Sequence, residues 1–314
     1  MTIRPFLATM LTAALLAACG APDQTQSDAS NVPTPTAETP PNTDIYLMDM
    51  ALTDEGTPAL TILRPAITGP GYDNQPSFIP GAASFYYAAS GESGKTDIWR
   101  YDLATGDTAQ ITDTPTESEY SPRQAPDGRS IAYIQESPDG SMTTLNVRDP
   151  EGTARRIVEL APLGYYAFFD SGLQAAVFYR SEPPELHLID IVRSLNTRHA
   201  QSIGRGLYAS PDGSGVHYTT TSGEAVLLNR YDTATTTSTL LFPLPPGAQD
   251  YAIFALPDGS TAFLAGSETT LYFHPGATTE DWVEVADLGD AEVGQITRLA
   301  VSEDLGTLAV VVGE

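Results

Sequence analysis

The chain has 314 residues, of which 40 are acidic and 15 are basic, and its formal net charge is −25 at pH 7. A field of this sign repels nucleic acids and anionic lipid headgroups at long range, so neither is expected as a partner. Cys19 is the only cysteine, which excludes an intramolecular disulfide.

Residues 1–18 are predicted to be a lipoprotein signal peptide. An apolar run from Phe6 to Ala18 follows a single cation at Arg4 and is too short to span a bilayer. Its end, Leu16-Ala17-Ala18-Cys19, resembles a bacterial lipobox, in which the cysteine is acylated. The alternative is an ordinary secretory signal with a chance cysteine. By the same resemblance, Gly20 favours the outer membrane, so we expect Cys19 to anchor the protein to the periplasmic face of that bilayer.

Residues 19–43 are predicted to be a tether. After Cys19 this segment consists mostly of Pro, Thr, Ser, Asn, Gln, Asp and Ala, with almost nothing to bury. The folded domain is expected to occupy residues 44–314. A flexible tether would let that domain stand away from the membrane and reorient.

Six turns centred on glycine punctuate the rest of the chain. The glycines are 41 to 47 residues apart, and each turn separates two runs rich in β-forming residues. The turns are Pro80-Gly81, Pro126-Asp127-Gly128, Asp170-Ser171-Gly172, Pro211-Asp212-Gly213, Pro257-Asp258-Gly259 and Glu303-Asp304-Leu305-Gly306. A period that accommodates four strands predicts a β-propeller.

The repeat from 75 to 115 gives the clearest strands. They are expected at 77–79, 83–88, 97–103 and 108–112, and the third alternates apolar and polar residues as a half-buried strand should. Copies of this third strand recur at 145–149, 186–190 and 228–232, with a looser copy at 271–273 and a sixth at 44–49.

The sixth copy precedes the first turn instead of following the last. The C-terminal region supplies only two inner strands, 296–301 and 307–312, while 44–50 and 60–68 supply the missing third and fourth strands. Joining them predicts an all-β, six-bladed propeller of four-stranded antiparallel blades, with its last blade closed by the two ends of the domain. Closure would remove the exposed edge of an open ring.

Three segments resemble the TolB-type, WD-like propeller repeat. They are Asn74 to Phe78, Ser118 to Gly128, and the strand Asp97-Ile98-Trp99-Arg100-Tyr101-Asp102. The resemblance covers roughly residues 44 to 314 and is weakest around 163–203, where the turn lacks its proline. TolB also carries an α/β domain that has no counterpart here, so the resemblance does not imply a role in the Tol-Pal system.

Motifs for catalysis are scarce. Residues 89–96 match a phosphate-loop pattern, but the residues that follow are strand-like where that loop needs a helix, so we expect a polar loop. No Gly-x-Ser-x-Gly elbow occurs. His187, His199, His217 and His274 are expected on second, third or fourth strands, without metal-ligand spacing. The sequence therefore predicts no catalytic residue, metal or cofactor.

Candidate binding residues are those expected just ahead of each innermost strand, where six loops converge on the channel. This set is polar and aromatic, a composition suited to recognition. It comprises Asn74, Glu119, Tyr120, Tyr165, Arg205, Tyr208, Asp250 and Arg298. The alternative is a structural role, because hydrogen bonds between adjacent blades need polar residues at the same places.

The favoured interpretation is a non-catalytic, monomeric envelope module that binds a protein or peptide at the channel mouth and contacts the bilayer through acylated Cys19 only. The alternative is a protein that binds glycans or small ligands, or an enzyme centred on the channel that acts on envelope glycans. Its support is the tyrosines that could stack on sugar rings, Tyr120, Tyr165, Tyr166, Tyr208 and Tyr251.

Overall fold

The computed structural model describes residues 41–91, 94–276 and 281–313. The predicted signal peptide, Cys19 and most of the predicted tether lie outside these residues. Within the described ranges, no helix is long and apolar enough to cross a membrane.

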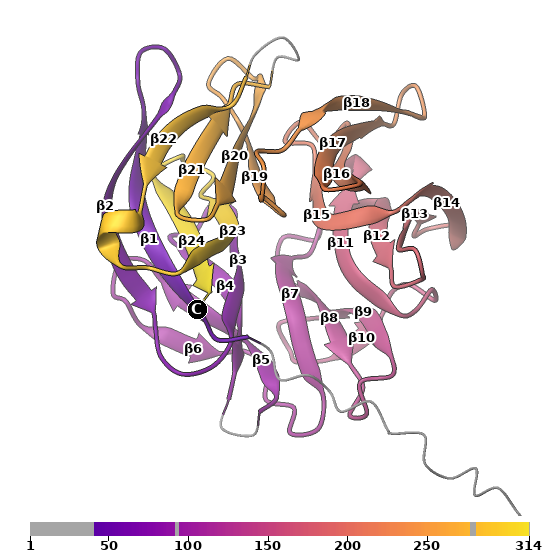
Figure 1. Ribbon diagram of the computed structural model, residues 1–314. Coiled ribbons are helices and arrows are strands. Elements are labelled where there is room, and N and C mark those ends of the chain that lie inside the picture. The colour runs from indigo at the N-terminus through magenta and orange to yellow at the C-terminus, as the bar shows by residue number, and fades with distance from the viewer. Residues whose placement is uncertain (1–40, 92–93, 277–280, 314) are drawn as a thin grey trace, which may run out of the picture. The chain divides into compact units, whose positions relative to one another are not determined.

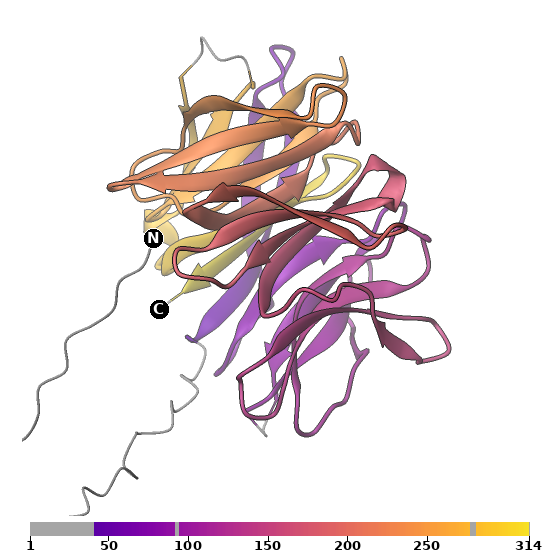
Figure 2. The same ribbon diagram turned by 90° about the vertical axis from the view of Figure 1, so that its right-hand side faces the viewer.

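Six four-stranded antiparallel sheets are arranged as the blades of a ring, which confirms the predicted six-bladed β-propeller (Figures 1 and 2). Each blade is named below from its innermost strand outward. Blade one is β3 (Asp73–Phe78), β4 (Ser84–Ser90), β5 (Thr96–Asp102) and β6 (Thr108–Gln110). Blade two is β7 (Ser118–Gln124), β8 (Ile131–Glu136), β9 (Thr143–Arg148) and β10 (Ala154–Arg156). Blade three is β11 (Leu163–Phe169), β12 (Gln174–Tyr179), β13 (Glu185–Asp190) and β14 (Leu195–Gln201).

The second half of the ring repeats this pattern. Blade four is β15 (Ile203–Ala209), β16 (Gly215–Ser222), β17 (Ala225–Asp232) and β18 (Thr237–Pro243). Blade five is β19 (Tyr251–Ala255), β20 (Thr261–Ser267), β21 (Thr270–His274) and β22 (Val283–Asp287). Blade six is β23 (Gln295–Val301), β24 (Thr307–Gly313), β1 (Thr43–Leu52) and β2 (Pro58–Ile67). Two short 3-10 turns, η1 (Asp170–Gly172) and η2 (Gly289–Ala291), complete the described elements.

Blade six joins the two ends of the domain, as the sequence predicted. Strand β1 lies between β2 and β24, and its antiparallel register with β24 runs from Thr43 opposite Gly313 to Asp49 opposite Thr307. Strand β1 begins one residue earlier than the expected strand, at Thr43. The buried hydroxyl of Thr43 donates to the backbone oxygen of Asp73 at 3.0 Å and so ties blade six to blade one.

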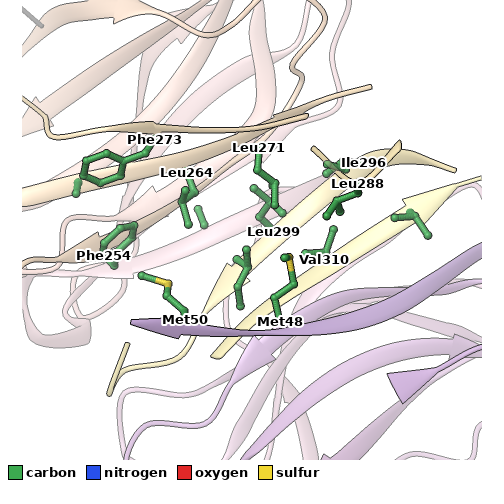
Figure 3. Close-up of a cluster of buried hydrophobic side chains, with 14 residues drawn as sticks. Met48, Met50, Phe254, Leu264, Leu271, Phe273, Leu288, Ile296, Leu299 and Val310 are labelled. Carbon is green, nitrogen blue, oxygen red and sulfur yellow. The ribbon is translucent and has the colours of Figure 1, made fainter. Parts of the chain in front are cut away.

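Strand β1 packs apolar side chains on both of its faces. Ile45 and Leu47 belong to the cluster that contains Phe85 of blade one. Met48 and Met50 point the other way, into a cluster with Leu264, Phe273 and other residues of blade five (Figure 3). Because successive residues of a strand face opposite sides, one strand here completes two hydrophobic cores.

The Pro-Asp-Gly turns close the inner hairpins through local hydrogen bonds. In blade two, the Asp127 carboxylate accepts from the amides of Arg129 and Ser130 at 3.0 and 2.8 Å, and Gly128 has φ +71°. The glycines of the first five turns all have a positive φ, but in the sixth turn the positive φ falls on Leu305, at +60°, and not on Gly306. A leucine there carries steric strain that glycine would avoid.

The phosphate-loop pattern lies where the sequence predicted, between second strand β4 and third strand β5. The amide of Gly91 donates to the backbone oxygen of Lys95 at 2.9 Å, and β5 begins at Thr96. A strand therefore follows where a phosphate loop needs a helix N-terminus. Residues 92–93 of this loop lie outside the described residues.

Candidate binding channel

A cavity of about 350 Å³ lies at the centre of the ring and is lined by the innermost strands of all six blades. Its lining runs from the middle of these strands to Pro80 and Glu303, in the turns that follow β3 and β23. Residues at the starts of the innermost strands do not line it. The cavity therefore lies toward the face that carries the inner hairpin turns.

The expectation that the candidate residues precede the innermost strands was wrong, except for Asp250. Asn74, Glu119, Tyr120, Tyr165, Arg205, Tyr208 and Arg298 all lie within those strands. The reason is a shift of register inside five of the six, for example between Asn74 and Ser77 in β3. The extra residue interrupts the alternation that marks a strand in the sequence, so these strands begin earlier than their apolar residues suggest.

Arg298 and Asp250 form the most buried ion pair of the described residues. The guanidinium Nη1 lies 3.1 Å from Asp250 Oδ2, and the two side chains are 10% and 2% exposed. Burial acts to lower the pKa of Arg298, but the adjacent Asp250 carboxylate and the tyrosines Tyr165, Tyr208 and Tyr72 together outweigh burial, and the pKa is raised. The guanidinium also lies 5.4 Å from the ring centroid of Tyr165, a cation–π distance. Arg298 is thus a charged side chain with a fixed position.

Tyr208 extends this cluster to a second arginine. Its hydroxyl donates to Asp250 at 3.0 Å, and burial raises its pKa, so the phenol stays protonated. On the ring of Tyr208 rests the guanidinium of Arg123, 5.0 Å from the centroid. A third arginine, Arg205, donates to the backbone oxygen of Thr297, next to Arg298. The structure therefore gathers Tyr165, Arg205, Tyr208 and Arg298 along the cavity, with Asp250 bonded to two of them.

Asn74, Glu119 and Tyr120 do not line the cavity. The Asn74 side chain accepts from the amide of Gln75 at 2.7 Å and donates to Thr43 at 3.3 Å, which supports ring closure. Glu119 is fully buried among polar side chains of blades one and two. Tyr120 packs edge-on against Tyr72, with ring centroids 6.2 Å apart. Contacts between blades thus account for all three.

Only some of the tyrosines considered for sugar stacking line the cavity. Tyr165, Tyr166 and Tyr208 line the cavity, whereas Tyr251 is fully buried against Tyr208 and Phe263. Tyr166 is only 1% exposed, and its hydroxyl donates to the backbone oxygen of Ser121 at 2.9 Å. Only Tyr165 and Tyr208 combine a place on the cavity with a partly exposed side chain.

Sequence reasoning missed Arg123, Gln75 and Ser121, which all line the cavity. Arg123 lies three residues after Tyr120, beyond the register shift of β7, so a count from the strand start does not place it on the channel. A signal was present nonetheless. Arg123 belongs to the repeat segment Ser118 to Gly128, in an innermost strand of a chain that has few cations.

The histidines lie on second, third and fourth strands as predicted, with His217 on β16 and His274 on β21. No group of three His, Cys, Asp or Glu side chains in the described ranges could hold a metal ion. His217 Nδ1 lies 3.2 Å from Ser210 Oγ, but the two residues are 2% and 3% exposed. Burial lowers the pKa of His217 to about 4, and this contact packs the interior of blade four.

Several solved structures resemble this chain in fold. A protein described as TolB from Agrobacterium tumefaciens superposes with a TM-score of 0.65 at 14% identity, covering 88% of this chain and 99% of that one. TolB from Acinetobacter baumannii superposes with a TM-score of 0.55 at 15% identity. The match covers 87% of this chain and 65% of the TolB chain. A chain of a nidogen–laminin complex superposes with a TM-score of 0.59 at 11% identity, covering 83% of this chain and 100% of that one.

These likenesses confirm the predicted TolB-type propeller as a fold. At 11 to 15% identity they establish the architecture alone. The sequence matches no family model. A search of curated proteins also finds no match.

Proposed function

We propose that this chain is a lipid-anchored propeller of the periplasm that binds a protein or peptide without catalysing a reaction. The observation that carries the proposal is the central cavity, where arginine and tyrosine side chains from several blades converge. Arginine and tyrosine are the residue types that dominate binding energy at protein interfaces. The TolB likenesses and the likeness to a chain of a nidogen–laminin complex support a protein partner.

The site is proposed at the face of the inner hairpin turns. There the cavity reaches Pro80 and Glu303 and can admit an extended segment or a side chain of a partner. Tyr165, Arg205, Tyr208 and Arg298 are the proposed contacts, and Asp250 holds two of them in place. Asn74, Glu119 and Tyr120 are assigned to contacts between blades.

Site-directed photo-crosslinking in intact cells tests the location. A photoreactive residue replaces Ser77, which lines the cavity, and in a matched variant it replaces Leu195 on outermost strand β14, which is 58% exposed. We expect Ser77 to capture one defined protein that Leu195 does not. The purified partner should then bind the purified propeller, and Tyr165→Ala should weaken that binding by about tenfold. Equal capture at both positions would place the interface elsewhere.

The lipid anchor is tested by Cys19→Ser. Acyl chains on one cysteine are the proposed membrane attachment, so the variant should move to the soluble periplasmic fraction and keep the thermal unfolding midpoint of the wild type. Membrane fractionation and a melting curve measure the two outcomes. A variant that stays in the membrane fraction would contradict the anchor.

The glycan alternative has its own test. Glycan fragments that bind the native state must raise the unfolding midpoint, because ligand binding stabilises the folded protein. A shift that neither Tyr165→Ala nor Tyr208→Leu changes would argue against sugar stacking in the channel, because both variants remove the aromatic ring.

A further inference from the structure

The cavity concentrates positive charge in an otherwise acidic protein. Three of the 15 basic residues, Arg123, Arg205 and Arg298, line it, and they come from blades two, four and six. Two carboxylates are near. Asp250 pairs with Arg298, and Glu303 accepts from the backbone amide of Gly81 at 2.8 Å. The arginine charges therefore outnumber the carboxylates paired with them.

The three guanidinium groups belong to one connected cluster. Arg123 lies on the ring of Tyr208, whose hydroxyl binds Asp250, and Asp250 pairs with Arg298. Arg205 joins at Thr297, the residue before Arg298. Packing on Tyr208 and the bond to Thr297 fix the directions of Arg123 and Arg205 before any ligand arrives. Preorganised side chains lose less entropy on binding.

Some hydrogen-bond donors of these arginines have no acceptor. The Nε groups of Arg205 and Arg298 are buried and have no hydrogen-bond partner, and Arg123 makes no ion pair with any described residue. A buried donor without an acceptor costs free energy, as does a charge without a counter-charge. Guanidinium groups match the planar geometry of a carboxylate and can bind it through two parallel hydrogen bonds.

The size and walls of the cavity narrow the ligand further. About 350 Å³ accommodates one or two amino-acid residues and excludes a folded domain. The arginines share this lining with apolar residues, among them Pro76, Pro122 and Ile253. A carboxylate attached to a small apolar group fits both parts of this surface.

We propose that the cavity binds the carboxylate of a peptide segment, with Arg123 and Arg205 as its direct ligands and the Arg298–Asp250 pair as their support. This assignment rests on the proposed peptide-binding function and names the chemical group that the site recognises. A terminal carboxylate and an Asp or Glu side chain share that chemistry, and the experiment separates them.

The test is calorimetric titration of the purified propeller with acetylated tripeptides that end in leucine. One series has a free terminal carboxylate, one has a terminal amide, and a third has the amide with an internal Glu. We expect the free acid to bind about tenfold or more tightly than the plain amide, the usual effect of a charge-assisted hydrogen bond. Binding of the third series at acid-like affinity would assign the recognised group to a side chain.

The variants Arg123→Gln and Arg205→Gln should each lower the affinity for the acid by about tenfold and leave the amide unchanged. Arg155→Gln, on exposed strand β10, is the matched control and should bind as the wild type does. If Arg205→Gln fails to fold, Arg205→Lys keeps the charge and should recover part of the preference. Thermal melts of each variant report on folding.

Equal affinity for acid and amide peptides would overturn carboxylate recognition. Tighter binding of a simple uronic acid, the carboxylate form of the glycan alternative, than of every peptide would overturn the peptide source. If crosslinking finds a partner at Ser77 while acid and amide bind equally, the proposed function stands and this inference fails. If neither a partner nor a peptide binds, both fail.

Discussion

Glu119 is a carboxyl group held inside the ring by neutral donors. Thr114 Oγ1 donates to it at 2.6 Å, Thr112 Oγ1 at 3.1 Å and Gln135 Nε2 at 3.4 Å. No cation pairs with it in the described part of the chain. Burial, and to a lesser degree the nearby Asp97 charge, raises the pKa of Glu119 to about 7, although the hydrogen bonds oppose this.

This shift makes the stability contributed by Glu119 depend on pH. A carboxyl whose folded-state pKa lies above its unfolded value binds more protons in the folded state, so the free energy of unfolding falls as pH rises between those values. For Glu119 the window runs from 4.5 to about 7. Glu119→Gln removes this titrating charge. The free energy of unfolding of the variant, relative to that of the wild type, should therefore rise by about 2 kcal/mol between about pH 5 and about pH 8.

Urea unfolding of both proteins at the two pH values measures this gain. The difference between the proteins is the quantity to compare, because other groups titrate in the same range. Buried His217, with its pKa lowered to about 4, acts in the opposite direction, whereas Asp73, with its pKa raised to about 6 by burial and by Asp44, acts in the same direction. A stability difference that is constant with pH would show that Glu119 does not titrate in this window.

The innermost strands show what the sequence could and could not predict. Turn chemistry and two-residue alternation are local signals, and they located the strands and the blade that each belongs to. Register shifts are not local. Gln75 and Ser121 adopt φ +58° and +53°, although neither is glycine or asparagine, and the Ser121 amide donates to Gln75 Oε1 at 2.5 Å across two blades. Tertiary contacts select these conformations, so no pattern within one strand reports them.

The same limit explains the outcome at the candidate site. Arg205 and Glu119 were selected for equivalent reasons, as polar residues near the start of an innermost strand. Arg205 lies beside the cavity, and Glu119 points into the contact between blades one and two. Which side a residue faces depends on its place relative to the register shift. Residue type and spacing could therefore identify the candidate residues. Only the fold shows which of them line the cavity and which lie between blades.

Closure of the ring is a property of the whole domain. Strand β1 pairs with β24 along seven residues and completes the hydrophobic clusters on both of its faces. Blade six also contacts blade one through Glu303, which accepts from the Gly81 amide, and through Thr43. Removal of β1 would expose the β24 edge and both clusters at once.

Deletion of residues 44–68 should therefore abolish cooperative unfolding. The lost strands bury Ile45, Leu47, Met48 and Met50. Burial of each such side chain contributes about 1.5–3 kcal/mol, so the loss, about 6–12 kcal/mol, is comparable with the whole stability of a typical domain, about 5–15 kcal/mol. Thermal unfolding followed by circular dichroism and calorimetry measures the effect. A deletion variant that melts in one transition at the wild-type midpoint would contradict closure by these strands.

The position of β1 also fixes the order of events during synthesis. Among the described strands, hairpin β1–β2 is made first, but β24, which pairs with the other edge of β1 in blade six, is made last. Until then, the two hydrophobic clusters to which β1 contributes are incomplete, and the edge of β1 that faces β24 is unpaired. Such an edge can pair with a wrong strand. A contact between such distant segments is slow to form. One edge of β1 must therefore stay unpaired until β24 has been synthesised. Factors that shield unpaired strands should raise the yield of closed rings.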